Sequence, residues 1–505
     1  MTPFSECPLL SLHMDSIICL LLSALTVLAV GVNRLRWSKL DAIPSVGPSG
    51  YLSSYYGAAR FILHAKTMIQ EGYDQYKDGF FKVPMMNRWV VVITGPRLLE
   101  ELRKIPDERL SFDHAMRDLL QVKYTFGLEV QEQPYHVQVV RDHLRRNISQ
   151  LFPEVFEEIR LSFDDIVPLR ETEWVKVGAY SAAMKAVCRA SNRVFVGLPI
   201  CQSSEFEELQ SKFARQVIAR ASLMNLFPTL LHPLTSRLLT NTFSSLRRCI
   251  ELLKPIVDER LKKEELLGKN WPGKPCDTIS WLLDVSSPED RNVRSIALRI
   301  LILNIASLHP LTQTFTHALF NLAVYPQFQE PLREEVKAVI SQHGWSRESM
   351  SLLPKMDSFL KESQRVSTTT ILPVMRKAME DVIFSDGTKI PSGTHVTVAS
   401  GPMHLDSRYY PNAYEFDPFR FCSSRKEALT KDSMNLSHIS FGHGKRKCPG
   451  QFFSSTMMTT MMAYLVLNYD MKLENDGVRP PDVWFLMSCA PNRTAEILFR
   501  RRPTC

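Results

Sequence analysis

The chain has 505 residues, of which 45% are hydrophobic and 23% charged, an ordinary balance for a folded protein with a large core. Its net charge of +8 comes from dispersed lysines and arginines, so the composition gives no indication of nucleic-acid binding. None of the ten cysteines forms a Cys-x-x-Cys pair, which excludes the usual zinc and thioredoxin-like patterns and favours a reduced, cytosol-facing protein.

The first predicted element is a membrane anchor. Ile17–Val32 is a run of 16 residues without a charge, slightly short for a spanning helix. The charged residues before the run are both acidic, Glu6 and Asp15, and three basic residues follow it: Arg34, Arg36 and Lys39. The positive-inside rule therefore places the C-terminal part in the cytoplasm. A cleaved signal peptide needs basic residues before the run and a small-residue cleavage site after it, and both are missing. A buried core helix is the remaining alternative.

Residues 37–50 form a link rich in proline and glycine. Pro44, Gly47, Pro48 and Gly50 prevent a helix here, so we expect a stiff, extended segment. The sequence thus predicts three parts: an N-terminal tail and transmembrane anchor over residues 1–36, the link over 37–50, and one large body over 51–505.

The body is predicted to be mainly helical. Apolar residues recur at three- and four-residue spacing in Leu98–Lys104, His136–Phe152, Glu205–Leu226, Phe243–Glu265 and Val293–Tyr325. Strand patterns are fewer: Phe81–Pro84, Trp89–Thr94, Val382–Phe384, His395–Val398, and a C-terminal pair around Val483–Met487 and Thr494–Phe499. The sequence has no internal repeat, so we expect one helical body with a minor strand region.

The most informative segment is Phe441–Gly450, which reads FGHGKRKCPG. Its three glycines and one proline predict a tight loop whose backbone can pass close to a flat ligand. Three basic residues precede Cys448, and a segment of helical pattern begins after Gly450. Positive charges and a helix N-terminus both stabilise a thiolate, and Phe441 can shield the sulfur from water.

Together these features describe a polarised thiolate in an apolar pocket, which is the environment of a haem axial ligand. Two other interpretations are weaker. A P-loop needs Ser or Thr after Gly444-Lys445, where this chain has Arg446. A buried cysteine taken alone is more often a small hydrophobic residue than a ligand.

The spacing F-x-x-G-x-R-x-C-x-G resembles the signature of the cytochrome P450 family without a mismatch. This resemblance implies the cytochrome P450 fold, mainly α with small β-sheets, as a single large haem domain. It also implies haem b as cofactor, with Cys448 as the axial ligand of the iron. The other residues that it places around the haem are Phe441, Gly442, Gly444, Arg446 and Gly450.

Two further segments are similar to family motifs. Glu362-Ser-Gln-Arg365 matches the E-x-x-R element, whose first and last residues share one face of a helix. Phe416–Phe421 resembles the P-x-R-F element, which contributes Arg420. The resemblance implies a buried cluster of Glu362, Arg365 and Arg420 that locks the loop carrying Cys448.

The propionate-binding element of the family, W-x-x-x-R, is incomplete here because no tryptophan precedes Arg141 at the required spacing. Arg141 is a candidate propionate ligand, with a plain surface arginine as the alternative. Arg446 is better matched to the family's pattern.

The chain departs from the family in the long helix that should cross the haem. Where the family has an acid and a threonine, this chain has His309 and Pro310. The histidine resembles fungal members related to kaurene oxidases, whereas the proline is unusual even among them. Pro310 cannot donate a backbone hydrogen bond, so it should kink the helix and free the carbonyl of Ala306. We expect His309 and Thr312 to share proton delivery. Packing roles for both, or delivery through Thr314 or a water on the freed carbonyl, are the alternatives.

The resemblance implies a membrane-bound monooxygenase that oxidises a lipophilic small molecule, such as a fungal terpenoid, by hydroxylation or in several steps. No G-x-G-x-x-G follows a strand, so electrons should come from a separate NADPH–cytochrome P450 reductase. The implied location is the endoplasmic reticulum membrane, with a single span. Substrate contacts are expected from Thr369–Pro373 and Phe485–Ser488, with Leu226–Leu231 at the rim. A rearrangement enzyme that does not activate dioxygen, or a non-catalytic haem-binding protein, remains open.

Overall fold

The computed structural model describes residues 31, 39–50, 52–167, 173–227, 229–238, 243–422, 439–474 and 477–503. Apart from residue 31, the predicted anchor Ile17–Val32 lies outside these ranges. Most of the link is described. It is extended at residues 44–46, since the amide of Lys82 donates to Pro44 and the amide of Val46 donates to Lys82, at 2.8 and 3.0 Å, whereas residues 39–42 form turns.

Helices make up most of the body, as predicted. They are α2 (Ser53–Gln75), α3 (Pro96–Lys104), α4 (Phe112–Leu119), α5 (Val122–Thr125), α6 (Glu129–Glu132), α7 (Tyr135–Gln138), α8 (Arg145–Ile166), α9 (Ala179–Phe195), α10 (Ser204–Met224), α11 (His232–Leu238), α12 (Phe243–Leu267), α13 (Thr278–Val285), α14 (Val293–Val324), α15 (Gln329–His343), α16 (Arg347–Met350), α17 (Pro354–Val366), α18 (Ser400–His404) and α20 (Gln451–Asn468). Short polar side chains begin several of them, as when Asn292 accepts from the amide of Ser295 at the start of α14.

The strands are short: β1 (Phe80–Met85), β2 (Arg88–Ile93), β3 (Leu110–Ser111), β4 (Val175–Gly178), β5 (Arg376–Ala378), β6 (Val382–Ile383), β7 (Lys389–Ile390), β8 (His395–Val398), β9 (Tyr469–Lys472), β10 (Val483–Phe485), β11 (Ser488–Ala490) and β12 (Glu496–Arg501). The largest sheet has the order β1-β2-β8-β5-β3, and β4-β12-β9 form a second sheet. The predicted pairing of β1 with β2 is confirmed, with Val83 opposite Val90. The two predicted C-terminal strands exist but belong to different sheets, since β10 pairs with β11.

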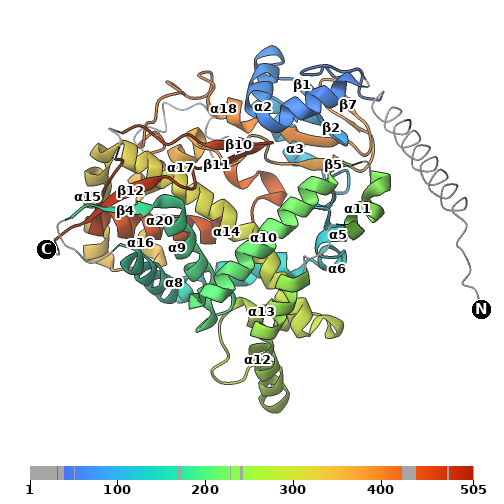
Figure 1. Cartoon of the computed structure of the whole chain (residues 1–505). Helices are drawn as coiled ribbons and strands as arrows, with labels where there is room; N and C mark the ends of the chain where they lie inside the picture. Colours follow the sequence, from blue (N-terminus) through green and yellow to red (C-terminus); the bar gives the residue numbers. More distant parts are fainter. Residues whose placement is uncertain are drawn as a thin grey trace, which may run out of the picture.

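Two hydrophobic cores support this architecture. The larger lies among the helices and includes most of the apolar side chains of α9, α14 and α20. The smaller joins the five-stranded sheet to α2 and α3. Figure 1 shows the strands β1 and β2 with α2 (blue) gathered at one end of the molecule, and the long helices filling the rest.

Helix α14 belongs to the core. Among the described residues it is the one helix that is long and apolar enough to span a membrane, with a mean hydropathy of 1.4 over its most apolar window. Because 67% of that window is buried inside the protein, we assign it as a core helix. It continues through Pro310 as one helix. The proline therefore removes the hydrogen bond to the carbonyl of Ala306 without ending the helix.

Candidate functional site

The loop that carries Cys448 is closed by its own backbone. The amide of Cys448 donates to the carbonyl of Phe441 at 2.8 Å. Gly442 and Gly444 have φ of +75° and +73°, the left-handed region that glycine adopts without strain. Gly444 also lies so close to the Arg103 side chain that a Cβ atom would collide with it. The predicted tight loop is therefore confirmed, and α20 begins directly after it.

Cys448 and helix α14 line the same cavity, whose volume is about 270 Å³. The accessible thiol faces this internal space, opposite Ala306, Ser307 and Pro310. The loop after α17 supplies another wall, which includes Thr370. Among the described residues that line the cavity, none is charged. The sulfur of Cys448 and Pro310, at which α14 departs from the family motif, thus line one uncharged cavity.

The protonation of Cys448 depends on what binds there. Burial raises the pKa of the Cys448 thiol, while the amide of Gly450 and the charge of Lys447 act in the opposite direction. The net shift is upward. A thiol of this kind is protonated at neutral pH unless a metal cation binds the sulfur, since coordination removes the proton.

A second cavity, of about 680 Å³, shares the Cys448 loop as a wall and is strongly cationic. Arg141, Arg376 and Arg446 all line it. Arg446 is already paired with Asp107 and Asp113. Arg376 is only 8% exposed, and among the described residues it has no carboxylate partner within ion-pair distance, although the charges of Asp107 and Asp113 act on it. Burial lowers the pKa of Arg376 to about 10.

A buried arginine without a carboxylate partner calls for an anionic ligand. Haem fits this arrangement, because its iron takes a thiolate ligand and its propionates are carboxylates. Cys448 would hold the iron, and Arg376 and Arg141 would bind the propionates. Sequence reasoning missed Arg376, which lies in β5 outside any short motif.

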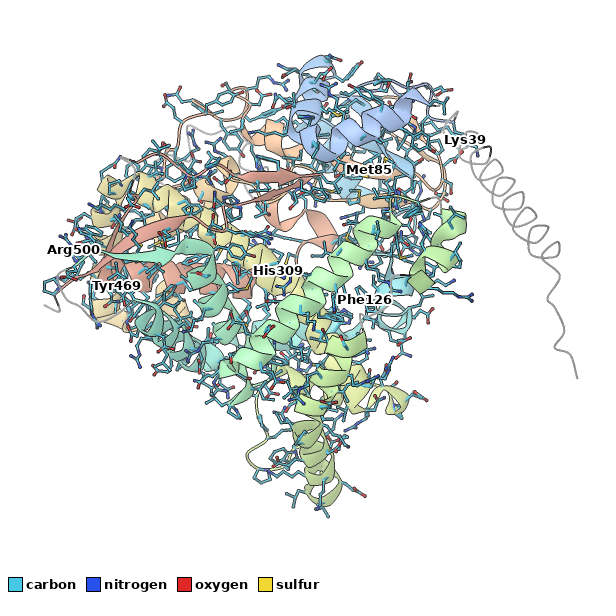
Figure 2. The ribbon with its side chains drawn as sticks, viewed as in Figure 1. Lys39, Met85, Phe126, His309, Tyr469 and Arg500 are labelled. Atoms are coloured by element: carbon cyan, nitrogen blue, oxygen red, sulfur yellow. The ribbon has the colours of Figure 1, made fainter. Side chains whose placement is uncertain are left out.

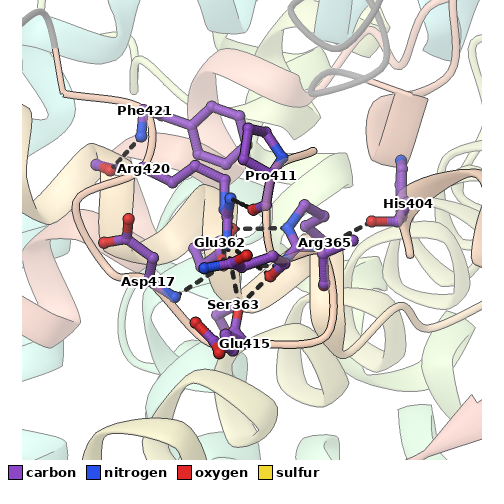
Figure 3. A network of polar contacts seen from close by, with 12 residues as sticks. Glu362, Ser363, Arg365, His404, Pro411, Glu415, Asp417, Arg420 and Phe421 are labelled. Carbon is purple, nitrogen blue, oxygen red and sulfur yellow. Dashed lines mark hydrogen bonds and ion pairs between the residues drawn. The ribbon is translucent and has the colours of Figure 1, made fainter. Parts of the chain in front are cut away.

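The structure brings Glu362, Arg365 and Arg420 together, as predicted (Figure 3). Both arginines hydrogen-bond the carboxylate of Glu362, which is fully buried; Nε of Arg365 lies 2.7 Å from it and Nε of Arg420 lies 3.1 Å from it. Their remaining donors bind backbone carbonyls of the following segment, at His404, Pro411, Asn412, Ala413 and Glu415. The cluster therefore ties α17 to residues 404–420, the segment that precedes the Cys448 loop.

The expectation that His309 and Thr312 share proton delivery stays a prediction. Neither lines the cavity of Cys448. Thr312 is fully buried, and its hydroxyl lies 3.6 Å from the sulfur of Met184 in α9. His309, labelled in Figure 2, has its pKa lowered by burial together with the charges of Arg493 and of Arg215 in α10. Two other hydroxyl residues of α14 do line the cavity, Ser307 and Thr314. The hydroxyl of Thr314 donates to the carbonyl of Pro310 and that of Ser307 to the carbonyl of Leu303, both at 2.8 Å.

The predicted substrate segments are only partly brought to the cavity. Thr369, Thr370 and Pro373 line it, as expected. Phe485–Ser488 do not line it, and Phe485 is 52% exposed. The rim residues Leu226 and Phe227 are exposed after the end of α10.

Comparison with known proteins agrees with this geometry. Residues 57–499 match the family model described as Cytochrome P450. The chain is 40% identical to Cytochrome P450 monooxygenase 103 of Postia placenta over 94% of this chain and 96% of that protein. It is 28% identical to an Ent-kaurene oxidase of Gibberella intermedia, over 93% and 90%. A crystal structure of the cytochrome P450DA heme domain superposes with a TM-score of 0.70 at 16% identity, covering 91% of this chain and 97% of that one.

Proposed function

The chain belongs to the cytochrome P450 family, as a haem-thiolate monooxygenase, and from that premise we propose that it is membrane-bound and oxidises a lipophilic small molecule. The observation that carries this proposal is the uncharged cavity shared by Cys448 and α14. An apolar substrate loses little by leaving water for such a space, whereas a charged one loses much.

When haem is bound, it supplies the oxidising power through its iron and its thiolate ligand. The protein's own groups hold the haem, shield it from water and supply protons. Cys448 provides the sulfur, and Arg376 and Arg141 provide counter-charges for the propionates. Pro310 leaves the carbonyl of Ala306 without its helical donor, so that carbonyl can hold a water beside the cavity. We propose that this water and the hydroxyl of Thr314 supply protons there.

The finer assignments are proposals as well. Haem b is the cofactor we propose, and NADPH–cytochrome P450 reductase is the proposed electron donor. The uncharged run Ile17–Val32 and the basic residues after it support a single-pass anchor in the endoplasmic reticulum membrane, with the body in the cytosol. Similarity to the relative named Ent-kaurene oxidase supports a terpenoid substrate, oxidised by hydroxylation or in several steps.

The test is turnover of the full chain in lipid vesicles with NADPH–cytochrome P450 reductase and a panel of terpenoids. We expect substrate-dependent consumption of NADPH and dioxygen, with oxygen incorporated into the product. Mass spectrometry of the products formed under isotopically labelled dioxygen measures this incorporation directly. Binding without turnover across the panel would contradict the monooxygenase proposal in favour of a non-catalytic haem protein.

A second function is favoured by Pro310. A family member that rearranges its substrate without activating dioxygen has no need of the hydroxyl that this position lacks. It would yield a product of unchanged elemental composition without consuming NADPH. The same assay separates the two functions.

A further inference from the structure

A buried polar cluster joins α14 to the C-terminal hairpin, outside the site described above. His317 of α14 is fully buried, and its Nδ1 lies 2.8 Å from a guanidinium nitrogen of Arg479. A second nitrogen of Arg479 donates to Asp482 at 2.9 Å. Asp482 directly precedes β10, and Arg479 lies three residues before Asp482. The cluster therefore connects the helix over the cavity with the base of the hairpin formed by β10 and β11.

The positive charge of this cluster comes from Arg479, which is paired with the carboxylate of Asp482. Among the described residues, His317, Asp482 and Cys489 each have a ligand atom within 4.8 Å of the others, a spacing that also suits a metal ion. An arginine can only donate, however, so Nδ1 of His317 must accept and Nε2 must carry the proton. A protonated Nε2 cannot bind a metal, and burial keeps the ring neutral by lowering the pKa of His317 to about 4. The guanidinium takes the place that a cation would occupy.

Arg479 also reaches the wall of the cavity. Its Nε donates to the side-chain oxygen of Asn321 in α14 at 3.2 Å. The side-chain nitrogen of Asn321 donates to the hydroxyl of Ser363 in α17 at 2.8 Å. Ser367, at the end of α17, accepts from both Asn321 and Arg479, at 3.3 and 3.4 Å. Ser367 lines the cavity of Cys448. One guanidinium thus links α14, α17 and the hairpin.

The hairpin in turn supports the next part of that wall. The amide of Cys489 donates to the carbonyl of Thr369 at 2.9 Å, and the amide of Ile371 donates to the carbonyl of Met487 at 3.0 Å. Thr369 and Thr370 line the cavity. An isolated two-stranded hairpin is at best marginally stable in water, so its position depends on what holds its base.

We propose that His317 and Arg479 are positioning residues that fix the C-terminal hairpin behind residues 367–371 and thereby determine which bulky apolar molecules fit the cavity. The proposal rests on the function proposed above only in assigning this cavity to the substrate. The network does not touch Cys448, so its loss should change the shape of the cavity while the haem remains bound.

The test compares two haem-binding probes of different size, imidazole and clotrimazole, by the shift of the Soret band in the full-length holoenzyme. Imidazole needs only the space beside the iron, whereas clotrimazole must also contact the wall. In Arg479→Met we expect the Kd of clotrimazole to rise at least about ten-fold, with the Kd of imidazole within about two-fold of wild type. An unchanged ratio of the two Kd values would overturn the proposal.

Two controls separate positioning from general destabilisation. Arg260 forms a buried pair with Asp277 away from the cavity, with Nη2 2.7 Å from the carboxylate, so Arg260→Met removes a similar interaction elsewhere. Arg260→Met should leave the ratio of the two Kd values unchanged. A change in that ratio equal to the change in Arg479→Met would also refute the proposal. His317→Asn keeps an acceptor near Nδ1 and should preserve the ratio, whereas His317→Leu should alter it. This pair decides the matter if Arg479→Met does not fold. A wild-type chain without a Soret band contradicts the proposed function instead.

Discussion

Thr314 is one of two hydroxyl residues of α14 that line the cavity, the other being Ser307, whereas Thr312 is packed against Met184. If protons reach the cavity through Thr314, then Thr314→Val should raise the fraction of NADPH electrons lost as hydrogen peroxide by about two-fold or more. Thr312→Val keeps the shape of a buried side chain and should leave that fraction unchanged. Peroxide formed per NADPH consumed is the measurement, and the opposite ranking of the two variants would refute the assignment.

Arg376 is a buried arginine without a carboxylate partner in the described part of the chain, which makes it the strongest candidate for a propionate. Charge-assisted hydrogen bonds contribute about 1.5–3 kcal/mol, so Arg376→Met should release haem at least about ten-fold faster. Transfer of haem to excess apomyoglobin measures the rate. Arg446→Met should have a smaller effect, because Arg446 is already paired with Asp107 and Asp113. A larger effect of Arg446→Met would contradict this order.

The sequence was informative about residues only where chemistry lies within a short motif. The Phe441–Gly450 loop and the shared helix face of Glu362 and Arg365 were predicted from spacing, because a tight loop and one helical turn are local structures. Arg420 was added to that pair only by the family resemblance. Thr312 does not line the cavity because each residue turns a helix by about 100°, which places Thr312 almost opposite the cavity-lining Pro310. Arg376 could not be found, because its burial and missing partner arise only when β5 meets the Cys448 loop.

At the scale of elements, the central feature is a proline in the middle of α14. Pro310→Ala restores the backbone N–H and should raise the free energy of unfolding by about 1–3 kcal/mol, since proline inside a helix costs up to about 3 kcal/mol. The restored N–H also donates to the carbonyl of Ala306, which then no longer holds the proposed proton-supplying water. We therefore expect more peroxide per NADPH as well as higher stability in chemical unfolding.

Pro255 inside α12 provides the matched control. Pro255→Ala should raise stability in the same way without changing peroxide formation, because Pro255 does not line the cavity. If both variants changed peroxide formation equally, the effect would be one of stability and not of the freed carbonyl.

Helices with a long periodic pattern were predicted well, as was the pairing of β1 with its sequence neighbour β2, but the pairing of the C-terminal strands was not. The sequence placed α10, α12 and α14 within a few residues of their observed bounds, since a 3.6-residue period is read from the segment itself. Pairing of strands depends on partners distant in sequence. For this reason β12 was grouped with β10, although it pairs with β4 and β9.

At the scale of the whole molecule, buried histidines make stability depend on pH. Burial lowers the pKa of His136, His317 and His395 from 6.5 to about 4. Between these values the unfolded chain binds more protons than the folded one, so stability is full above 6.5 and falls as the pH decreases toward 4. Each histidine contributes on the order of 1 kcal/mol per pH unit. Thermal unfolding midpoints should therefore fall by several degrees from neutral pH to about pH 5, and an unchanged midpoint would contradict this.

The overall organisation was predicted as one helical body with a minor strand region, and this is what the structure shows. The predicted anchor falls outside the described residues and remains a proposal. What could not be predicted without the family resemblance is the meeting of Cys448 with α14, because residues so far apart in sequence are brought together only by the packing of α14, α17 and α20.

The proposed function requires a bond between Cys448 and a haem iron. Its direct test is the absorbance spectrum of the purified, reduced protein under carbon monoxide, measured on wild type and on Cys448→Ser. We predict a Soret band at the strongly red-shifted position of a thiolate-ligated haem in wild type, and loss of that band in Cys448→Ser. A wild-type spectrum typical of histidine ligation, or a Cys448→Ser variant that keeps the red-shifted band, would contradict the account.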